Sequence, residues 1–62
     1  MTEAPDLNPF LEPGMLVEHP GQPAWGRGQV QSKIGTRLTV TFPEEGKVVI
    51  DSARIALRIV YE

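Results

Sequence analysis

The tetrapeptide Trp25-Gly26-Arg27-Gly28 is the part of this sequence whose composition most resembles a ligand-binding loop. Glycines beside an arginine can cradle a phosphate group, but a phosphate loop also requires a preceding strand and a following helix. It further requires a third glycine or a lysine–serine pair at fixed spacing. Strand-like sequence follows Gly28 directly, so no helix N-terminus is available for an anion. We therefore interpret Gly26 and Gly28 as residues that bend the chain, through unusual dihedral angles or a bulge.

Catalytic and metal-binding side chains are few. His19 is the only histidine and the chain has no cysteine, whereas a zinc site takes three or four ligands. A lone histidine at the end of a strand is typical of a hydrogen-bonded structural residue. The residue types of a hydrolase triad are present in His19, Asp51 and either Ser32 or Ser52. However, no nucleophile elbow surrounds either serine. We predict no enzyme activity, no catalytic residue, no metal and no cofactor.

The aromatic residues are too few for two common recognition sites. A methyl-lysine cage needs several aromatic walls and a proline-rich ligand needs an aromatic-lined groove. The chain has only Phe10, Trp25, Phe42 and Tyr61, and Phe42 alternates with core positions. Trp25 remains a candidate either for a lid over one end of the core or for an exposed anchor, since tryptophan is enriched at binding hot spots. The two roles are compatible.

Length and charge restrict the function further. The chain of 62 residues is enough for one domain with a thin core and leaves little room for a deep substrate pocket. Residues 1–12 carry three acidic and no basic side chains, whereas residues 13–62 carry six basic and five acidic ones. Such a nearly neutral body argues against strong sequence-independent DNA binding. Without cysteine, a signal peptide or a long apolar run, we expect a soluble cytoplasmic protein with no membrane contact.

Short strands and turns are predicted from Gly14 onward. The clearest signal is the alternation of Leu38, Val40 and Phe42 with threonines, which has the period of two of a half-buried strand. We predict strands at 15–19, 28–34, 37–42, 47–50 and 56–60, turns at 20–23 and 43–46, and a short 3₁₀ turn at 51–54.

Five short strands form a stable domain only if the sheet curls around a core, because a flat sheet would have nothing to cover its apolar face. We therefore expect an all-β fold, a five-stranded SH3-like or Tudor-like barrel over residues 14–62. A mobile acidic arm with several prolines is expected at residues 1–13, with a single turn starting at Asn8. Whether Phe10 and Leu11 pack on the barrel is left open. The predicted inward residues are Val17, Val30, Leu38, Val40, Phe42, Val49, Ile55, Leu57 and Val60.

A family resemblance extends over residues 13–60. It is carried by Pro13-Gly14-x-x-Val17-x-His19, Trp25-Gly26-x-Gly28-x-Val30, Val40-x-Phe42, Gly46-Lys47 and Leu57. This pattern resembles the Tudor-like C-terminal domain of UvrD/PcrA-type bacterial helicases. It is more loosely similar to the RNA-polymerase-interaction domain of CarD and of the transcription-repair coupling factor. The chain carries neither the helicase motor nor the helical DNA-binding domain of CarD, so it resembles a stand-alone bacterial version of the module.

The resemblance implies docking on a protein. In the helicases this domain contacts the β subunit of RNA polymerase, and the lysine that opens the fourth strand matches Lys47. It therefore implies a protein-binding module for RNA polymerase, or for a related transcription or repair factor, that pairs through an exposed strand edge. We predict Trp25, Arg27, Arg37 and Lys47 as partner contacts.

Two further possibilities stay open. The alternative function is weak binding of single- or double-stranded nucleic acid around Trp25, Lys33, Arg37 and Arg58, with bases stacked on the tryptophan. The chain is expected to be a monomer or a weak homodimer, since an open strand edge is also a site for self-association.

Overall fold

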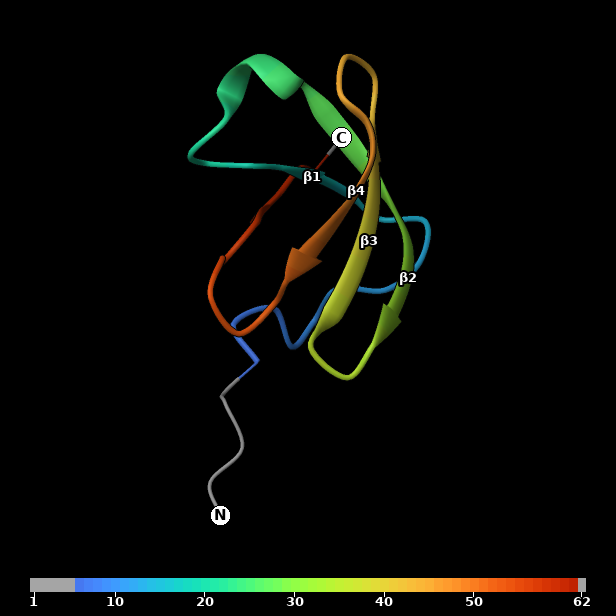
Figure 1. The fold of residues 1–62 in the computed structure, drawn as a ribbon, viewed down its shortest axis with the longest axis vertical. Helices are drawn as coiled ribbons and strands as arrows, with labels where there is room; N and C mark the ends of the chain where they lie inside the picture. The colour runs from blue at the N-terminus through green and yellow to red at the C-terminus, as the bar shows by residue number, and fades with distance from the viewer. Residues whose placement is uncertain (1–5, 62) are drawn as a thin grey trace.

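The computed structural model describes residues 6–61 and shows a curved antiparallel sheet (Figure 1). Its five strands lie in the order β4-β3-β2-β1-β5, and within residues 6–61 one 3₁₀ helix is present, just before β2. The elements are β1 (Leu16–Glu18), η1 (Pro23–Trp25), β2 (Arg27–Ile34), β3 (Arg37–Phe42), β4 (Gly46–Asp51) and β5 (Arg58–Ile59). The predicted all-β, five-stranded, barrel-like fold class is thus confirmed. Within residues 6–61, no helix has the length and apolar character needed to cross a membrane.

The sheet has two edges, β4 and β5, each of which pairs with a neighbour on one side only among the described residues. The backbone ladder is therefore open, and the expected full closure is not made by strand pairing. Side chains close the gap instead, because Ile50 of β4 and Leu57 just before β5 belong to the same buried cluster. The fold is a barrel in shape with a seam between β4 and β5.

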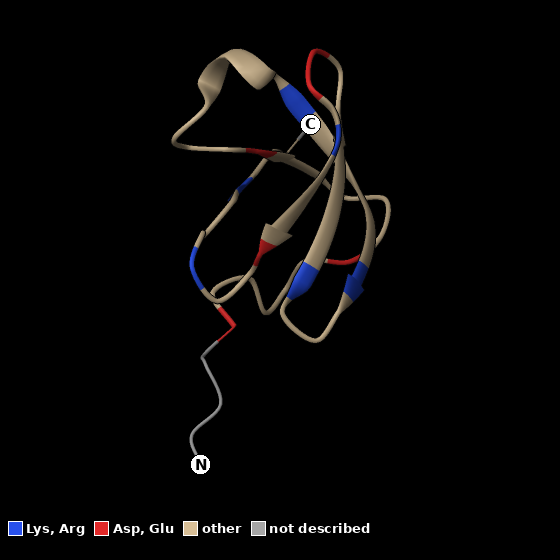
Figure 2. Ribbon diagram, in the orientation of Figure 1, with Lys and Arg blue, Asp and Glu red and all other residues tan. Residues whose placement is uncertain are grey.

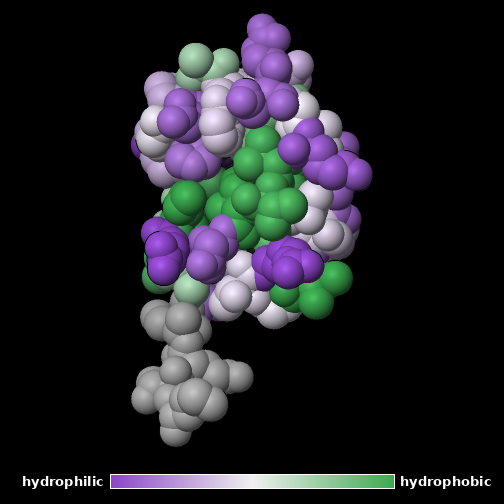
Figure 3. Space-filling model, in the orientation of Figure 1, coloured by the Kyte–Doolittle hydropathy of each residue, from purple (hydrophilic) through white to green (hydrophobic). Residues whose placement is uncertain are grey.

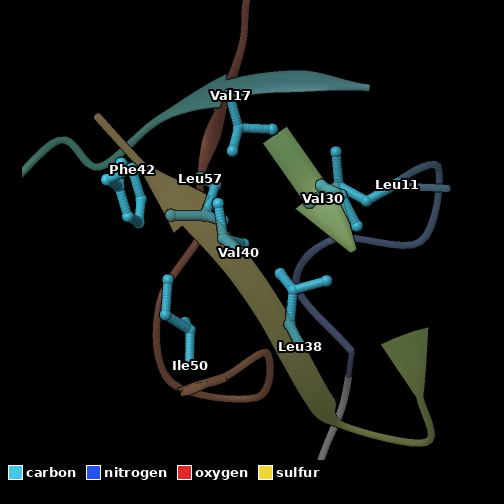
Figure 4. Packing of buried hydrophobic residues seen from close by; sticks show 8 residues of the cluster. All are labelled: Leu11, Val17, Val30, Leu38, Val40, Phe42, Ile50 and Leu57. Carbon is cyan, nitrogen blue, oxygen red and sulfur yellow. The ribbon is translucent and has the colours of Figure 1, made fainter. Parts of the chain in front are cut away.

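The core contains hydrophobic side chains from strands β1 to β4 and from the segments that precede β1 and β5 (Figure 4). The buried residues are Leu11, Val17, Val30, Leu38, Val40, Phe42, Ile50 and Leu57. Six of these were predicted, while Ile55 and Val60 are only half-buried.

The predicted inward position of Val49 is wrong. Its side chain is 63% exposed, and its neighbour Ile50 is 3% exposed. The register explains this result, because Leu38 pairs with Ile50 and Val40 pairs with Val48. Directly opposed residues of antiparallel strands share one face of the sheet, so β3 selects Val48 and Ile50 for the inner face.

The two glycines beside Trp25 have different roles. Gly26 has a φ of +77° and ends η1, so it supplies an unusual dihedral as predicted. Gly28 has no positive φ, but a Cβ there would lie 2.6 Å from Cγ1 of Val40 and 2.7 Å from the Phe42 ring. The bulge expected at this pair lies instead between Val30 and Ser32, where the β2–β3 register shifts. Strand β2, and no helix, follows Gly26.

Two turns differ from the prediction. Pro23–Trp25, at the end of the predicted turn at 20–23, forms η1 with proline at its start, where the fixed φ of proline favours a helical turn. Residues 52–54 form a hydrogen-bonded turn rather than a 3₁₀ helix, and the Asp51 carbonyl accepts the N–H groups of Arg54 and Ile55 at 3.0 and 3.1 Å.

Residues 6–11, which were assigned to the arm, pack on the body of the domain. Leu11 is 4% exposed and joins the core, whereas Phe10 is 78% exposed. The predicted turn at Asn8 is present as a bond from the Leu11 N–H to the Asn8 carbonyl at 3.3 Å. The remainder of the predicted arm before Asp6 lies outside the described residues.

Candidate functional site

The free edge of β4 is the candidate site, and its backbone orientation follows from one hydrogen bond. The Ser52 N–H donates to the Thr36 carbonyl at 2.7 Å, which makes Thr36–Ser52 a hydrogen-bonded pair of the β3–β4 ladder. Hydrogen-bonded and non-hydrogen-bonded pairs alternate along an antiparallel ladder. The N–H and C=O groups of Lys47, Val49 and Asp51 therefore point away from β3, toward the free edge.

The hydrogen bonds around Asp51 agree with this assignment. Its carbonyl accepts the N–H groups of Arg54 and Ile55, so it is directed away from β3. Within residues 6–61, no backbone group bonds to the outward N–H and C=O of Lys47 and Val49. These groups leave a short stretch of edge able to accept a further strand.

The side chains along this edge are exposed and differ in character. Lys47, Val49 and Asp51 lie on the outer face of β4. A hollow of about 310 Å³ lies beside them, lined by Thr36, Arg37, Val49, Ile50 and Asp51. Figure 3 shows a hydrophobic area bordered by hydrophilic side chains on the face where β4 and the segment leading to β5 are in view. The edge thus offers a basic residue, an apolar centre and an acidic residue in succession.

Trp25 packs at the margin of the core. Its ring meets the ring of Phe42 edge to face at a centroid distance of 5.2 Å, and that of His19 at 5.0 Å. Nδ1 of His19 in turn accepts the N–H of Gly21 at 3.1 Å. Trp25 is half-buried and covers Phe42, which is the lid arrangement. Its predicted contact with a partner stays a prediction.

The predicted basic contacts do not form one cluster. Arg27 opens β2, whereas Arg37 pairs with Ile34 at the other end of β2, roughly 20 Å away at 3.3 Å per residue. Arg27 and Arg58 both lie opposite Glu18, one on each side of β1. Figure 2 accordingly shows basic segments at both ends of the sheet. Of the predicted contacts, Arg37 and Lys47 lie nearest the β4 edge, since they are on β3 and β4.

Lys33, a residue of the alternative nucleic-acid site, is held by the N-terminal segment. Its Nζ lies 2.7 Å from Oδ2 of Asp6 and also donates to the carbonyl of Asn8. Hydrogen bonds from Lys33, from the Ser52 hydroxyl and from the Asn8 N–H lower the pKa of Asp6 from 3.8 to about 2. The Lys33 side chain is only 15% exposed, so it offers little charge to a phosphate.

Asn8 fixes the N-terminal segment against the seam. Its Nδ2 donates to Oγ of Ser52 at 2.7 Å and to the Ile55 carbonyl at 2.8 Å, and its Oδ1 accepts the Leu57 N–H at 2.7 Å. The sequence predicts only the start of a turn at Asn8. An asparagine among acidic residues and prolines carries no local signal of burial, because all three of its partners lie far along the chain.

Ser52, one of the two serines considered for a triad, is part of this same packing. Ser52 is fully buried, and its hydroxyl donates to Asp6. His19 contacts Trp25 instead. In the part of the chain that the structure describes, no three histidine, aspartate or glutamate side chains gather where they could hold a metal ion.

Comparison with known proteins gives a family and no annotated relative. Neither a curated protein nor a solved structure matches the chain significantly. Residues 11–60 match the sequence model of a family described as "Protein of unknown function (DUF3553)". The matched segment contains all five strands, the Trp25 lid and the β4 edge. Because the match extends over most of the chain, this protein belongs to the DUF3553 family.

Proposed function

We propose that this protein is a non-catalytic binding module that accepts an extended strand of a partner protein at the free edge of β4. The observation that carries the proposal is the outward backbone of Lys47 and Val49, with no backbone partner among residues 6–61. In strand addition, such main-chain groups supply affinity and alternate side chains supply specificity.

The side chains on the edge define the partner strand. A strand laid on β4 would place an acidic residue beside Lys47 and an apolar, preferably β-branched, residue beside Val49, since opposed side chains of these kinds stabilise a sheet. Arg37 adds a second positive charge on β3, and the hollow next to it can take a side chain of the partner.

We propose RNA polymerase, through its β subunit, or a related transcription or repair factor as the partner. The support is the family resemblance and the position of Lys47, the second residue of β4, on the proposed docking edge. Trp25 and Arg27 lie farther from this edge, so we assign them at most peripheral contacts.

Nucleic-acid binding is the weaker alternative. Lys33 forms an ion pair with Asp6, and Arg58 lies opposite Glu18 in the β1–β5 pairing. The basic side chains of residues 6–61 are divided between the two ends of the sheet, so within this part of the chain they form no single surface to neutralise a series of phosphates, which is the usual source of affinity for DNA.

Binding of RNA polymerase core enzyme to the immobilised protein tests the proposal. We expect Val49→Pro to weaken binding about tenfold or more, equivalent to about 1.4 kcal/mol, because it removes an outward N–H without removing a bond to β3. Lys47→Glu should weaken binding similarly, whereas Arg58→Glu, the same charge reversal on β5, should not.

Two results would count against this function. The first is that wild-type protein captures no polymerase. The second is that Val49→Pro binds polymerase as tightly as wild type while retaining its native thermal melting. Fluorescence anisotropy with single-stranded and duplex DNA over a salt series tests the alternative, since phosphate-driven binding must fall steeply with salt.

A further inference from the structure

The sequence of β4 is complementary to itself when two copies are laid antiparallel. Its central residues are Lys47-Val48-Val49-Ile50-Asp51. If Val49 of one copy lies opposite Val49 of a second copy, Lys47 faces Asp51 and Val48 faces Ile50. The positive end of each strand thereby meets the negative end of the other, and apolar side chains fill the middle.

The outward backbone groups of β4 can form hydrogen bonds in the same register. The N–H and C=O groups of Lys47, Val49 and Asp51 point to the free edge, so these residues form the hydrogen-bonded pairs of the added ladder. The two Val49 residues exchange two bonds, and each Asp51 N–H donates to the opposite Lys47 carbonyl. The Asp51 carbonyl already accepts two N–H groups within its own chain, so the ladder ends there.

Other registers are less favourable. Sliding one strand by two residues places Lys47 or Asp51 opposite Val49, depending on direction, and leaves both charged pairs unmade. Sliding it by four residues places Lys47 opposite Lys47, or Asp51 opposite Asp51, depending on direction, and like charges directly opposed destabilise a sheet. Only the register centred on Val49 places Lys47 opposite Asp51 at both ends while the two Val49 residues pair their outward backbone groups.

We propose that a second copy of this chain occupies the β4 edge, with a two-fold axis at Val49. This contact is isologous, so it closes at two subunits and does not propagate into a filament. The other edge is a poor competitor. The Val60 N–H bonds to the Leu16 carbonyl, so in the two-residue strand β5 only Ile59 directs its backbone outward.

The dimer has a consequence for binding but does not depend on the proposed partner. It pairs the outward N–H and C=O of Val49 and the outward C=O of Lys47, and it covers the Val49 side chain, which is 63% exposed in the single chain. Self-association and strand addition by a partner therefore exclude each other. The protein would hold its docking edge paired with a second copy until a partner strand replaces it.

Sedimentation velocity of the purified chain alone tests the inference. We expect a monomer–dimer equilibrium whose dimer fraction rises with concentration, and a dimer dissociation constant about tenfold or more higher for Val49→Pro and for Lys47→Asp. A wild-type protein that stays monomeric at every concentration overturns the inference, as does a dimer that both variants leave unchanged. Because no polymerase is present, this failure is separate from failure of the proposed function.

Two further variants test the register. Lys47→Asp and Asp51→Lys should each dimerise poorly alone, and an equimolar mixture should form a heterodimer, because the mixture restores opposite charges at both ends. Asp51 also accepts the Ala53 N–H at 3.0 Å, so circular dichroism must first show that Asp51→Lys is folded.

Disulfide formation gives a result that does not depend on Asp51. The natural chain has no cysteine, so Val49→Cys introduces a single thiol. Hydrogen-bonded antiparallel pairs have Cα atoms about 5.5 Å apart, within the range that a disulfide spans. We expect Val49→Cys to cross-link rapidly under mild oxidation and Thr41→Cys, on the outer face of β3, to cross-link slowly. Equal rates for the two variants contradict the proposed axis.

Discussion

Replacing Gly28 with alanine tests whether this glycine is required for close packing. A Cβ at position 28 would lie 2.6 Å from Cγ1 of Val40 and 2.7 Å from two ring carbons of Phe42. Carbon atoms in favourable contact are about 3.5–4.0 Å apart, so the neighbours would have to move by about 1 Å. Both neighbours are almost fully buried, at 0% and 1% exposure, and cannot turn into solvent.

The expected cost follows from this geometry. Inserting a methyl group into a well-packed core typically costs about 1–3 kcal/mol. A domain of 62 residues has a free energy of unfolding of about 3–9 kcal/mol at the usual stability per residue. Gly28→Ala should therefore remove roughly a third of the stability, with a native-like fold retained in the remaining folded population.

Urea unfolding followed by the fluorescence of Trp25 measures this change. Trp25 is the only tryptophan and packs on Phe42, so its emission reports on the affected part of the core. Gly21→Ala is the matched control, because the added Cβ would meet only ring atoms of the half-buried His19, at 3.3 Å or more. If Gly28→Ala unfolds within about 0.5 kcal/mol of wild type, the requirement for close packing is refuted.

Four other substitutions have outcomes that the structure determines. Asn8→Ala should lower the free energy of unfolding by about 2 kcal/mol or more in a chemical denaturation, because it leaves the Ile55 carbonyl and the Leu57 N–H unpaired; an unchanged midpoint would contradict this. Asp6→Asn should destabilise the protein at neutral pH but not near pH 2. Since folding lowers the pKa of Asp6 from 3.8 to about 2, the stabilisation by the ionised carboxylate is fully present above pH 3.8 and is lost as the pH falls to about 2. The urea midpoints of wild type and Asp6→Asn over a pH series measure this loss of stabilisation. A difference between the two midpoints that is the same at all pH values would contradict the prediction. In thermal melts, Ile50→Ala should cost about 2–5 kcal/mol and Val49→Ala less than about 1, and equal costs would show that the β4 faces are assigned wrongly.

How well the sequence predicted each strand depended on its pattern. Residues 37–42 alternate regularly between apolar and polar side chains, and the predicted strand and its buried face are both confirmed. In β4 three apolar residues stand in succession, so a period of two cannot indicate which of them face inward. Val49 was misassigned for this reason, and only pairing with β3 resolves the choice.

The site was harder to predict because its main features are not local. The position of Lys47 on an edge follows from the strand order, which the hydrophobic pattern does not specify. Lys33 looked like an exposed cation because its partner Asp6 lies in a different part of the chain. The roles of Gly28 and Asn8 likewise depend on residues brought together by folding, namely Val40 for the first and Leu57 for the second.

The position of Asn8 also constrains how this domain is completed during translation. Asn8 is synthesised before the groups it bonds, because these belong to Ser52, Ile55 and Leu57, which follow it by more than forty residues. Synthesis proceeds at about 5–20 residues per second, so several seconds pass between the synthesis of Asn8 and that of its hydrogen-bond partners. Nascent chains stalled before residue 57 is exposed should therefore remain sensitive to proteases, and resistance should appear only when that last segment has emerged.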